Sequence, residues 1–194
     1  MIHIIFLASG SSRRFGTNKL LYELDGKPIF RYGLDLLRDL TLSRVDCTAT
    51  VVSRYAEIRA AAEQAGLRAV DSPQSEQGIS YSIRAGLEAL PALQPEDFLL
   101  FLVADQPRLT RETIDRMIDA ARPGVLLGMA VWKDQAGNPA FFSALLFDEL
   151  YALSGDCGGR AVIRRHEADC LRIPVTDPRE LSDVDTPATL QNID

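Results

Sequence analysis

The stretch that decides the fold opens the chain: IHIIFL at residues 2–7, then ASGSSRRFG at residues 8–16 and KLL at residues 19–21. The first run, almost wholly apolar and ended by small residues, predicts a buried strand. Small residues let backbone N–H groups approach an anion, and arginine and lysine side chains neutralise a polyphosphate. The first twenty-one residues therefore predict a strand that leads into a loop for a nucleoside triphosphate.

Apolar runs and helical patterns alternate along the rest of the chain. Strands are predicted at residues 2–7, 48–52, 67–70, 98–103, 125–131, 140–142 and 171–175. Helices are predicted between and after them, at residues 29–40, 57–65, 79–90, 111–121, 144–153 and 159–165. This alternation predicts a three-layer α/β/α fold, with a mostly parallel twisted sheet and helices on both faces. Ligands of such sheets bind at the carboxyl ends of the strands.

The length and composition of the chain predict how many domains it has, and its net charge predicts which partners it does not bind. The 194 residues are 46% hydrophobic and show no linker or repeat, so we expect one domain over residues 1–194. A net charge of −6 argues against nucleic acid or an anionic membrane surface as the main partner.

The cysteines and the first residues of the chain predict the cellular compartment in which the protein is found. Cys47, Cys157 and Cys170 are scattered, which predicts reduced thiols with neither a zinc site nor a disulfide framework. The first strand begins directly after Met1, and no apolar run is long enough to cross a bilayer. We therefore expect a soluble, cytoplasmic protein.

The second motif is FLLFLVADQP at residues 98–107. An apolar run that ends in Asp105 places a carboxylate at the carboxyl end of a strand, and Pro107 forces the chain to turn. Mg²⁺ prefers one or two carboxylates together with substrate phosphates, so Asp105 is a candidate ligand. The alternative is that Asp105 only caps the next turn or helix.

The third motif is LSDVDTP at residues 181–187. Asp183 and Asp185 point to the same side of an extended segment, so at least one of them is a candidate to complete a metal site. The alternative is a helix start with Thr186 as N-cap and Pro187 at the first helical position, and both interpretations can hold at once.

These motifs resemble those of a known enzyme family. The first loop lacks the Gly-Lys-Ser/Thr of a Walker loop and the spaced glycines of a dinucleotide fingerprint. Its Leu7-Ala8-Ser9-Gly10, Arg14-Phe15-Gly16 and Lys19-Leu20-Leu21 instead resemble the nucleotidyltransferase signature. With the two acidic motifs, nearly the whole chain resembles the small GT-A-like nucleotidyltransferases, and among them the molybdenum cofactor cytidylyltransferases.

The resemblance implies a set of site residues. Catalysis is assigned to Lys19, Arg14 and Asp105, and Mg²⁺ to Asp105 and Asp185, with Asp183 the alternative second ligand. The segment QGISYSIRAGL at residues 77–87 matches the family's segment beside the nucleotide. Nucleotide binding is assigned to Leu7, Ala8, Ser9, Gly10, Ser11, Ser12, Arg14, Lys19, Gly78, Ser80 and Ser82. Acceptor binding is assigned to Asn138, Pro139, Asp156, Arg160 and Asp183.

Two of these residues also have a simpler structural explanation, and two positions depart from the family pattern. Gly78 is expected to end a loop and Ser80 to cap the helix that follows. Ala104 stands where the family has glycine before the metal ligand, which raises the question of whether a methyl group fits there. Ser9 stands where cytidylyltransferases usually have alanine, and its hydroxyl offers a contact that alanine cannot make.

The function implied is transfer of CMP from CTP to the terminal phosphate of molybdenum-bound molybdopterin, with release of pyrophosphate. Its product would mature a molybdenum hydroxylase, which is then a possible partner. The alternatives are transfer from GTP or another nucleotide to a different acceptor, and a non-enzymatic chaperone that binds nucleotide or cofactor. A degenerate binder is expected to lose Lys19, Asp105 or Asp185, and the chain keeps all three.

Overall fold

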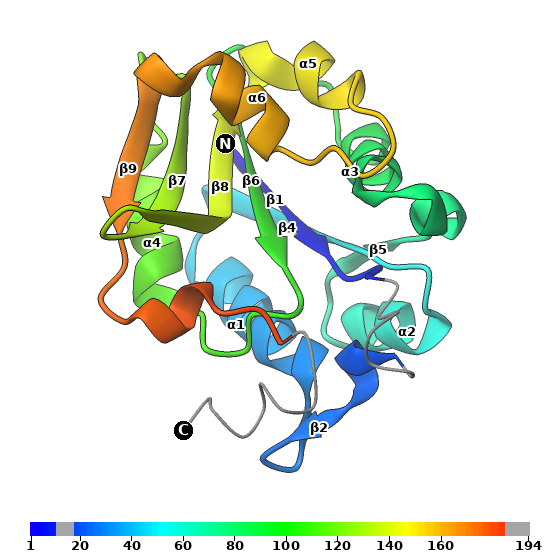
Figure 1. Cartoon of the computed structure of the whole chain (residues 1–194). Helices are drawn as coiled ribbons and strands as arrows, with labels where there is room; N and C mark the ends of the chain where they lie inside the picture. Colours follow the sequence, from blue (N-terminus) through cyan, green and yellow to red (C-terminus); the bar gives the residue numbers. More distant parts are fainter. Residues whose placement is uncertain (11–17, 185–194) are drawn as a thin grey trace.

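The computed structural model describes residues 1–10 and 18–184. Within them, seven strands form the main sheet: β1 (Ile2–Leu7), β4 (Cys47–Val52), β5 (Arg68–Val70), β6 (Phe98–Val103), β7 (Leu127–Trp132), β8 (Gln135–Ser143) and β9 (Cys170–Pro174). They lie side by side in the order β5-β4-β1-β6-β8-β7-β9 (Figure 1). A small antiparallel pair, β2 (Glu23–Leu24) and β3 (Lys27–Pro28), stands apart from this sheet.

The main sheet is mostly parallel, as predicted, with one strand reversed. β1 pairs in parallel with both β4 and β6, and β7 pairs in parallel with β9. β8 is antiparallel to both of its neighbours, β6 and β7. Only Lys133 and Asp134 connect β7 to β8, and so short a connection can join only antiparallel neighbours.

Helices cover both faces of the sheet, which confirms the predicted three layers (Figure 1). The helices are α1 (Ile29–Ser43), α2 (Ala56–Gln64), α3 (Ile79–Glu88), α4 (Arg111–Ala120), α5 (Phe147–Tyr151) and α6 (Arg160–Arg165). The apolar sides of α1, α2 and α4 join one core cluster, and those of α3, α5 and α6 join the other. No helix in the described part of the chain is both long and apolar enough to span a membrane.

The central strand β1 shows why helices must cover both faces of the sheet. All six of its residues are buried, and successive side chains point to opposite faces. Ile4 and Phe6 belong to the cluster under α1, whereas Ile5 and Leu7 belong to the cluster under α3. Gly33 lets α1 approach closely, since a β-carbon there would lie 2.6 Å from the Phe6 ring.

Short 3-10 helices complete the described fold: η1 (Lys19–Leu21), η2 (Pro73–Gln77), η3 (Ala144–Leu146), η4 (Glu167–Asp169) and η5 (Pro178–Leu181). The helix predicted at residues 144–153 is thus divided between η3 and α5. The prediction that Ser80 caps a helix is wrong. α3 begins one residue earlier, at Ile79, with Gly78 as its N-cap and no side-chain cap bond.

Candidate active site

Three parallel strands bring the first two motifs to one edge of the sheet. β1, β4 and β6 are adjacent and run in the same direction, so their carboxyl ends coincide. Beyond the strands, the Ala8 amide donates to the Val52 carbonyl at 2.8 Å and the Ala104 amide donates to the Leu7 carbonyl at 3.0 Å. The start of the first loop and Asp105 therefore lie side by side.

The residues after β4 hold the start of the first loop. Ser9 Oγ donates to the Val52 carbonyl at 3.3 Å and accepts from the Arg54 amide at 3.2 Å. These are contacts that alanine cannot make. The Tyr55 hydroxyl donates to the Gly10 carbonyl at 2.9 Å. The loop thus leaves the sheet in a fixed direction before residues 11–17, which lie outside the described residues.

Lys19 and Asp105 form an ion pair at this edge. Asn18 caps η1 by accepting from the Leu20 amide, which fixes the backbone at Lys19. Lys19 is buried, and its Nζ lies 2.7 Å from Asp105 Oδ2. A buried ammonium group needs such a partner. The pair places a positive charge beside a carboxylate, and these are the two groups that would hold a phosphate and its cation.

A cavity of about 240 Å³ opens above this pair. It is lined by Leu7, Ser9, Gly10, Lys19, Leu20, Ser75, Ile79, Ser82, Val103, Ala104, Asp105 and Asp156. Five of the predicted nucleotide-binding residues thus share one cavity with Asp105. The methyl group of Ala104 fits in its wall, since the residue is buried and packs in the core.

Three other predicted nucleotide-binding residues have different surroundings. Ala8 is fully buried in the core beneath α1. Gly78 packs on the backbone of Gly155, and the Ser80 amide donates to the Gly155 carbonyl at 3.2 Å. Gly78 and Ser80 therefore fix the loop at residue 155, which leads into Asp156 in the cavity wall.

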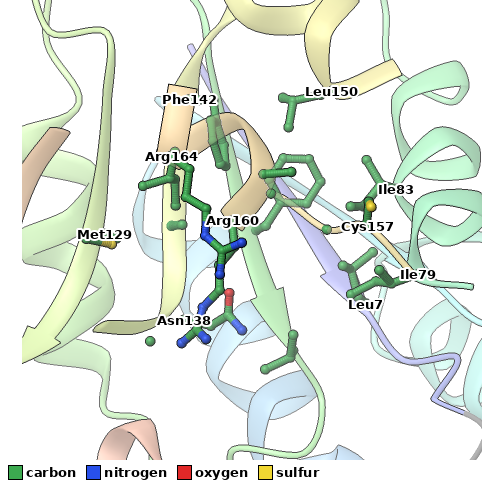
Figure 2. Close-up of a pocket in the computed structure, with 18 of the residues that line it drawn as sticks. Leu7, Ile79, Ile83, Met129, Asn138, Phe142, Leu150, Cys157, Arg160 and Arg164 are labelled. Atoms are coloured by element: carbon green, nitrogen blue, oxygen red, sulfur yellow. The ribbon is translucent and has the colours of Figure 1, made fainter. Parts of the chain in front are cut away.

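A second cavity, of about 380 Å³, lies beside the first and is shown in Figure 2. Arg160 and Asn138 lie on one side of it, and Leu7, Ile79 and Ile83 lie on the other. Its walls also include Phe101, Val103, Met129, Gly137, Ala140, Phe142, Leu150, Asp156, Cys157, Gly158, Gly159, Ala161, Ile163 and Arg164. Its volume and its mostly apolar lining with a few polar groups are typical of a site for a small molecule.

The two cavities share a wall. Leu7, Ile79, Val103 and Asp156 line both of them. The predicted acceptor residues Asn138, Asp156 and Arg160 all line the second cavity, with Pro139 directly after Asn138 in β8. The arrangement can hold two ligands side by side, as a transfer reaction between them requires.

The first residues of the third motif lie beside Asp105. The Val184 amide donates to the Asp105 carbonyl at 2.9 Å, and Gln106 Nε2 donates to Asp183 Oδ1 at 2.9 Å. Asp183 therefore lies next to the end of β6. Among the described residues, no three His, Cys, Asp or Glu side chains gather into a metal-binding cluster. Asp185 lies outside the described residues, as do Ser11, Ser12 and Arg14.

Sequence reasoning missed several residues that shape this site. Ser75 and Arg164 line the cavities, and Gln106 and Glu180 fix the third motif. Gln106 follows Asp105 directly, and this position beside a predicted metal ligand could have identified it as a site residue. Glu180 lies in a polar stretch, and no pattern distinguishes it from a solvated acid.

With this geometry established, comparison with known proteins identifies the family. Residues 4–170 match the model of the MobA-like NTP transferase domain. The chain belongs to this family. It is therefore a nucleotidyltransferase, and the two adjoining cavities are its candidate donor and acceptor sites.

Two bacterial proteins are among those with a similar sequence. Purine catabolism protein PucB of Bacillus subtilis is 27% identical over 200 residues, which cover 94% of this chain and 91% of that protein. Bifunctional protein GlmU of Burkholderia orbicola is 34% identical over 129 residues, which cover 63% of this chain but only 26% of that protein.

Solved structures share the fold over the full length. A nucleotidyl transferase from Methanothermobacter thermautotroptrophicus has a TM-score of 0.80 at 19% identity, covering 100% of this chain and 95% of that one. Rv0371c from Mycobacterium tuberculosis has a TM-score of 0.78 at 24% identity, covering 100% and 97%. Rv0371c has also been solved as a complex with manganese.

Proposed function

We propose that this protein transfers CMP from CTP to the terminal phosphate of molybdenum-bound molybdopterin and releases pyrophosphate, acting as one domain in the cytoplasm. The shared wall of the two cavities carries the proposal, because it would place the α-phosphate of a nucleotide beside an acceptor held between Arg160 and Ile79. The relative named purine catabolism protein fits a client molybdenum hydroxylase that acts on purines.

The chemistry of the acceptor explains which groups the site needs. The second pKa of a phosphate monoester is about 6, so at neutral pH the acceptor is already largely dianionic and needs no general base. The remaining difficulty is that two anions must meet. Lys19 would neutralise the α-phosphate, Arg14 the outer phosphates and Arg160 the acceptor, which lowers the barrier by electrostatics and alignment.

Mg²⁺ fits the donor set at the end of β6. Asp105 offers hard carboxylate oxygens to the donor cavity, and the third motif brings the Asp183 carboxylate beside the end of β6. Asp105 and Asp185 would hold the ion, with Asp183 as the alternative second ligand. A bound Mg²⁺ would supply charge neutralisation at the reacting phosphate and at the leaving pyrophosphate.

Replacing Lys19 with Ala is expected to lower kcat by at least about a hundredfold, the typical effect of losing one preorganised charge partner of the transition state. The matched control is Lys27→Ala, because Lys27 also pairs with an aspartate, Asp35, at 2.6 Å but lies at the surface. Steady-state pyrophosphate release measures both variants. Equal rates for the two would exclude Lys19 from catalysis.

Equilibrium binding of CTP, GTP, ATP and UTP, with and without Mg²⁺, tests the choice of donor. We expect CTP to bind most tightly and its affinity to rise with Mg²⁺ in the wild type but not in Asp105→Ala, which lacks a ligand. Isothermal titration calorimetry gives each constant directly. A preference for GTP would instead assign the protein to guanylyl transfer, and no metal-dependent binding of any nucleotide would contradict the proposal.

A further inference from the structure

Glu180 is a fully buried acid outside both cavities. It lies in η5 and is 1% exposed. Its Oε2 accepts from the Thr110 amide at 3.1 Å and from Thr110 Oγ1 at 2.6 Å, and its Oε1 accepts from Thr176 Oγ1 at 3.3 Å. Buried carboxylates are rare unless they are paired or hydrogen-bonded. Two of the donors belong to Thr110, the N-cap of α4, where the helix dipole also favours a negative charge, and the third belongs to Thr176, just before η5.

These contacts keep Glu180 ionised. Burial alone would raise the pKa of its carboxyl, but the hydrogen bonds from Thr110 and Thr113 outweigh burial and hold the pKa below its ordinary value. The charged carboxylate therefore links η5 to the start of α4 at neutral pH through its bonds to Thr110.

A second link holds the residues that follow Glu180. Gln106 is 4% exposed, and its Nε2 donates to the Leu181 carbonyl at 3.3 Å and to Asp183 Oδ1 at 2.9 Å. Val184 is fully buried, and its amide donates to the Asp105 carbonyl. The segment 181–184 is thus fixed at several points to the turn that carries Asp105.

We propose that Glu180 is a positioning residue of the metal site. Its carboxylate, together with the Gln106 amide, holds segment 181–184 against Asp105 and so determines how Asp183 would meet a divalent cation. This inference rests on the proposed metal-dependent function. Glu180 acts through the segment and does not itself touch substrate or metal.

The test measures metal binding directly. Mn²⁺ is titrated by electron paramagnetic resonance into the full chain in the presence of CTP, for wild type, Glu180→Gln and Gln106→Leu. Loss of a group that orients a metal ligand typically weakens metal affinity 10- to 100-fold, so we expect the Kd for Mn²⁺ to rise at least about tenfold in both variants. Binding of CTP without metal should stay within about twofold.

Asp97→Asn is the matched control. Asp97 is also a buried carboxylate that accepts from a backbone amide, that of Gln94 at 2.8 Å, but it precedes β6 at the opposite end of the strand. We expect this variant to lose stability and to keep wild-type Mn²⁺ affinity. The comparison separates a positioning role from a general loss of packing.

The possible results are distinct. Wild-type Mn²⁺ affinity in folded Glu180→Gln and Gln106→Leu would overturn the inference, as would an equal loss in Asp97→Asn. If Glu180→Gln does not fold, Thr110→Val takes its place, because it removes the hydroxyl that donates to Glu180 Oε2 at 2.6 Å, and the same rise in the Kd for Mn²⁺ is expected. Absence of Mn²⁺ binding by the wild type would instead contradict the proposed function, and this inference with it.

Discussion

Replacing Asp105 with Ala is expected to lower kcat by at least about a hundredfold and to abolish the metal dependence of nucleotide binding. The Asp105 carboxylate has two roles. It is the proposed Mg²⁺ ligand at the end of β6, and it neutralises the buried Lys19 ammonium at 2.7 Å. Its loss would remove the metal ligand and leave a buried charge without this partner, which is costly. Steady-state pyrophosphate release gives kcat, and calorimetric titration of CTP over a range of Mg²⁺ concentrations gives the metal dependence of binding.

Two further variants separate the charge of Asp105 from its other properties. Asp105→Asn keeps the size of the side chain and removes the charge, so it should be nearly as slow as Asp105→Ala. Asp35→Ala breaks a surface lysine pair of similar length, 2.6 Å, and should change kcat less than about twofold. Near wild-type turnover in Asp105→Ala would remove the metal assignment.

Replacing Gly78 with Ala is expected to destabilise the protein by about 3 kcal/mol or more, from backbone strain and overpacking together. Gly78 has φ 135° and ψ 165°, a conformation essentially reserved for glycine. A β-carbon there would also lie 2.1 Å from the Gly155 carbonyl oxygen. Since residue 155 leads into Asp156, which lines both cavities, nucleotide binding should weaken as well.

Gly124→Ala is the control for this variant. Gly124 also has positive φ, 89°, but a β-carbon there would meet nothing within 4 Å. Its cost should therefore be the backbone strain alone, about 1 kcal/mol, the lower end of the range for such residues. Urea unfolding followed by circular dichroism gives both free energies of unfolding. Similar losses for the two variants would show that a β-carbon at residue 78 adds no clash to the backbone strain.

The fold was predictable wherever one pattern had one explanation. The apolar runs at Ile2–Leu7 and Phe98–Val103 coincide with β1 and β6, because a strand buried on both faces is apolar throughout. The direction of β8 was not predictable from its apolar run at residues 140–142. Burial selects apolar residues whichever way a strand runs. β8 also begins at Gln135, five residues before the predicted strand, so the apolar runs do not show the short turn at Lys133 and Asp134 that determines its direction.

The sequence predicts individual residues of the candidate site better than it predicts the hydrogen bonds that join distant segments around it. Lys19 and Asp105 are 86 positions apart in the sequence, but each ends or follows a strand-associated motif, so their meeting could be expected. The hydrogen bond between Glu180 and Thr110 joins residues 70 positions apart, and both lie in polar segments whose sequence is typical of the protein surface. Contacts with residues distant in the sequence bury that acid, and no local pattern records them.

Pyrophosphate release by the purified protein with Mg²⁺ and either CTP or GTP, with and without molybdenum-bound molybdopterin, tests the proposed reaction itself. We expect release that requires the pterin, is fastest with CTP and falls at least about a hundredfold in Asp105→Ala. Release that is independent of the pterin, or equally fast in Asp105→Ala, would contradict the proposed reaction.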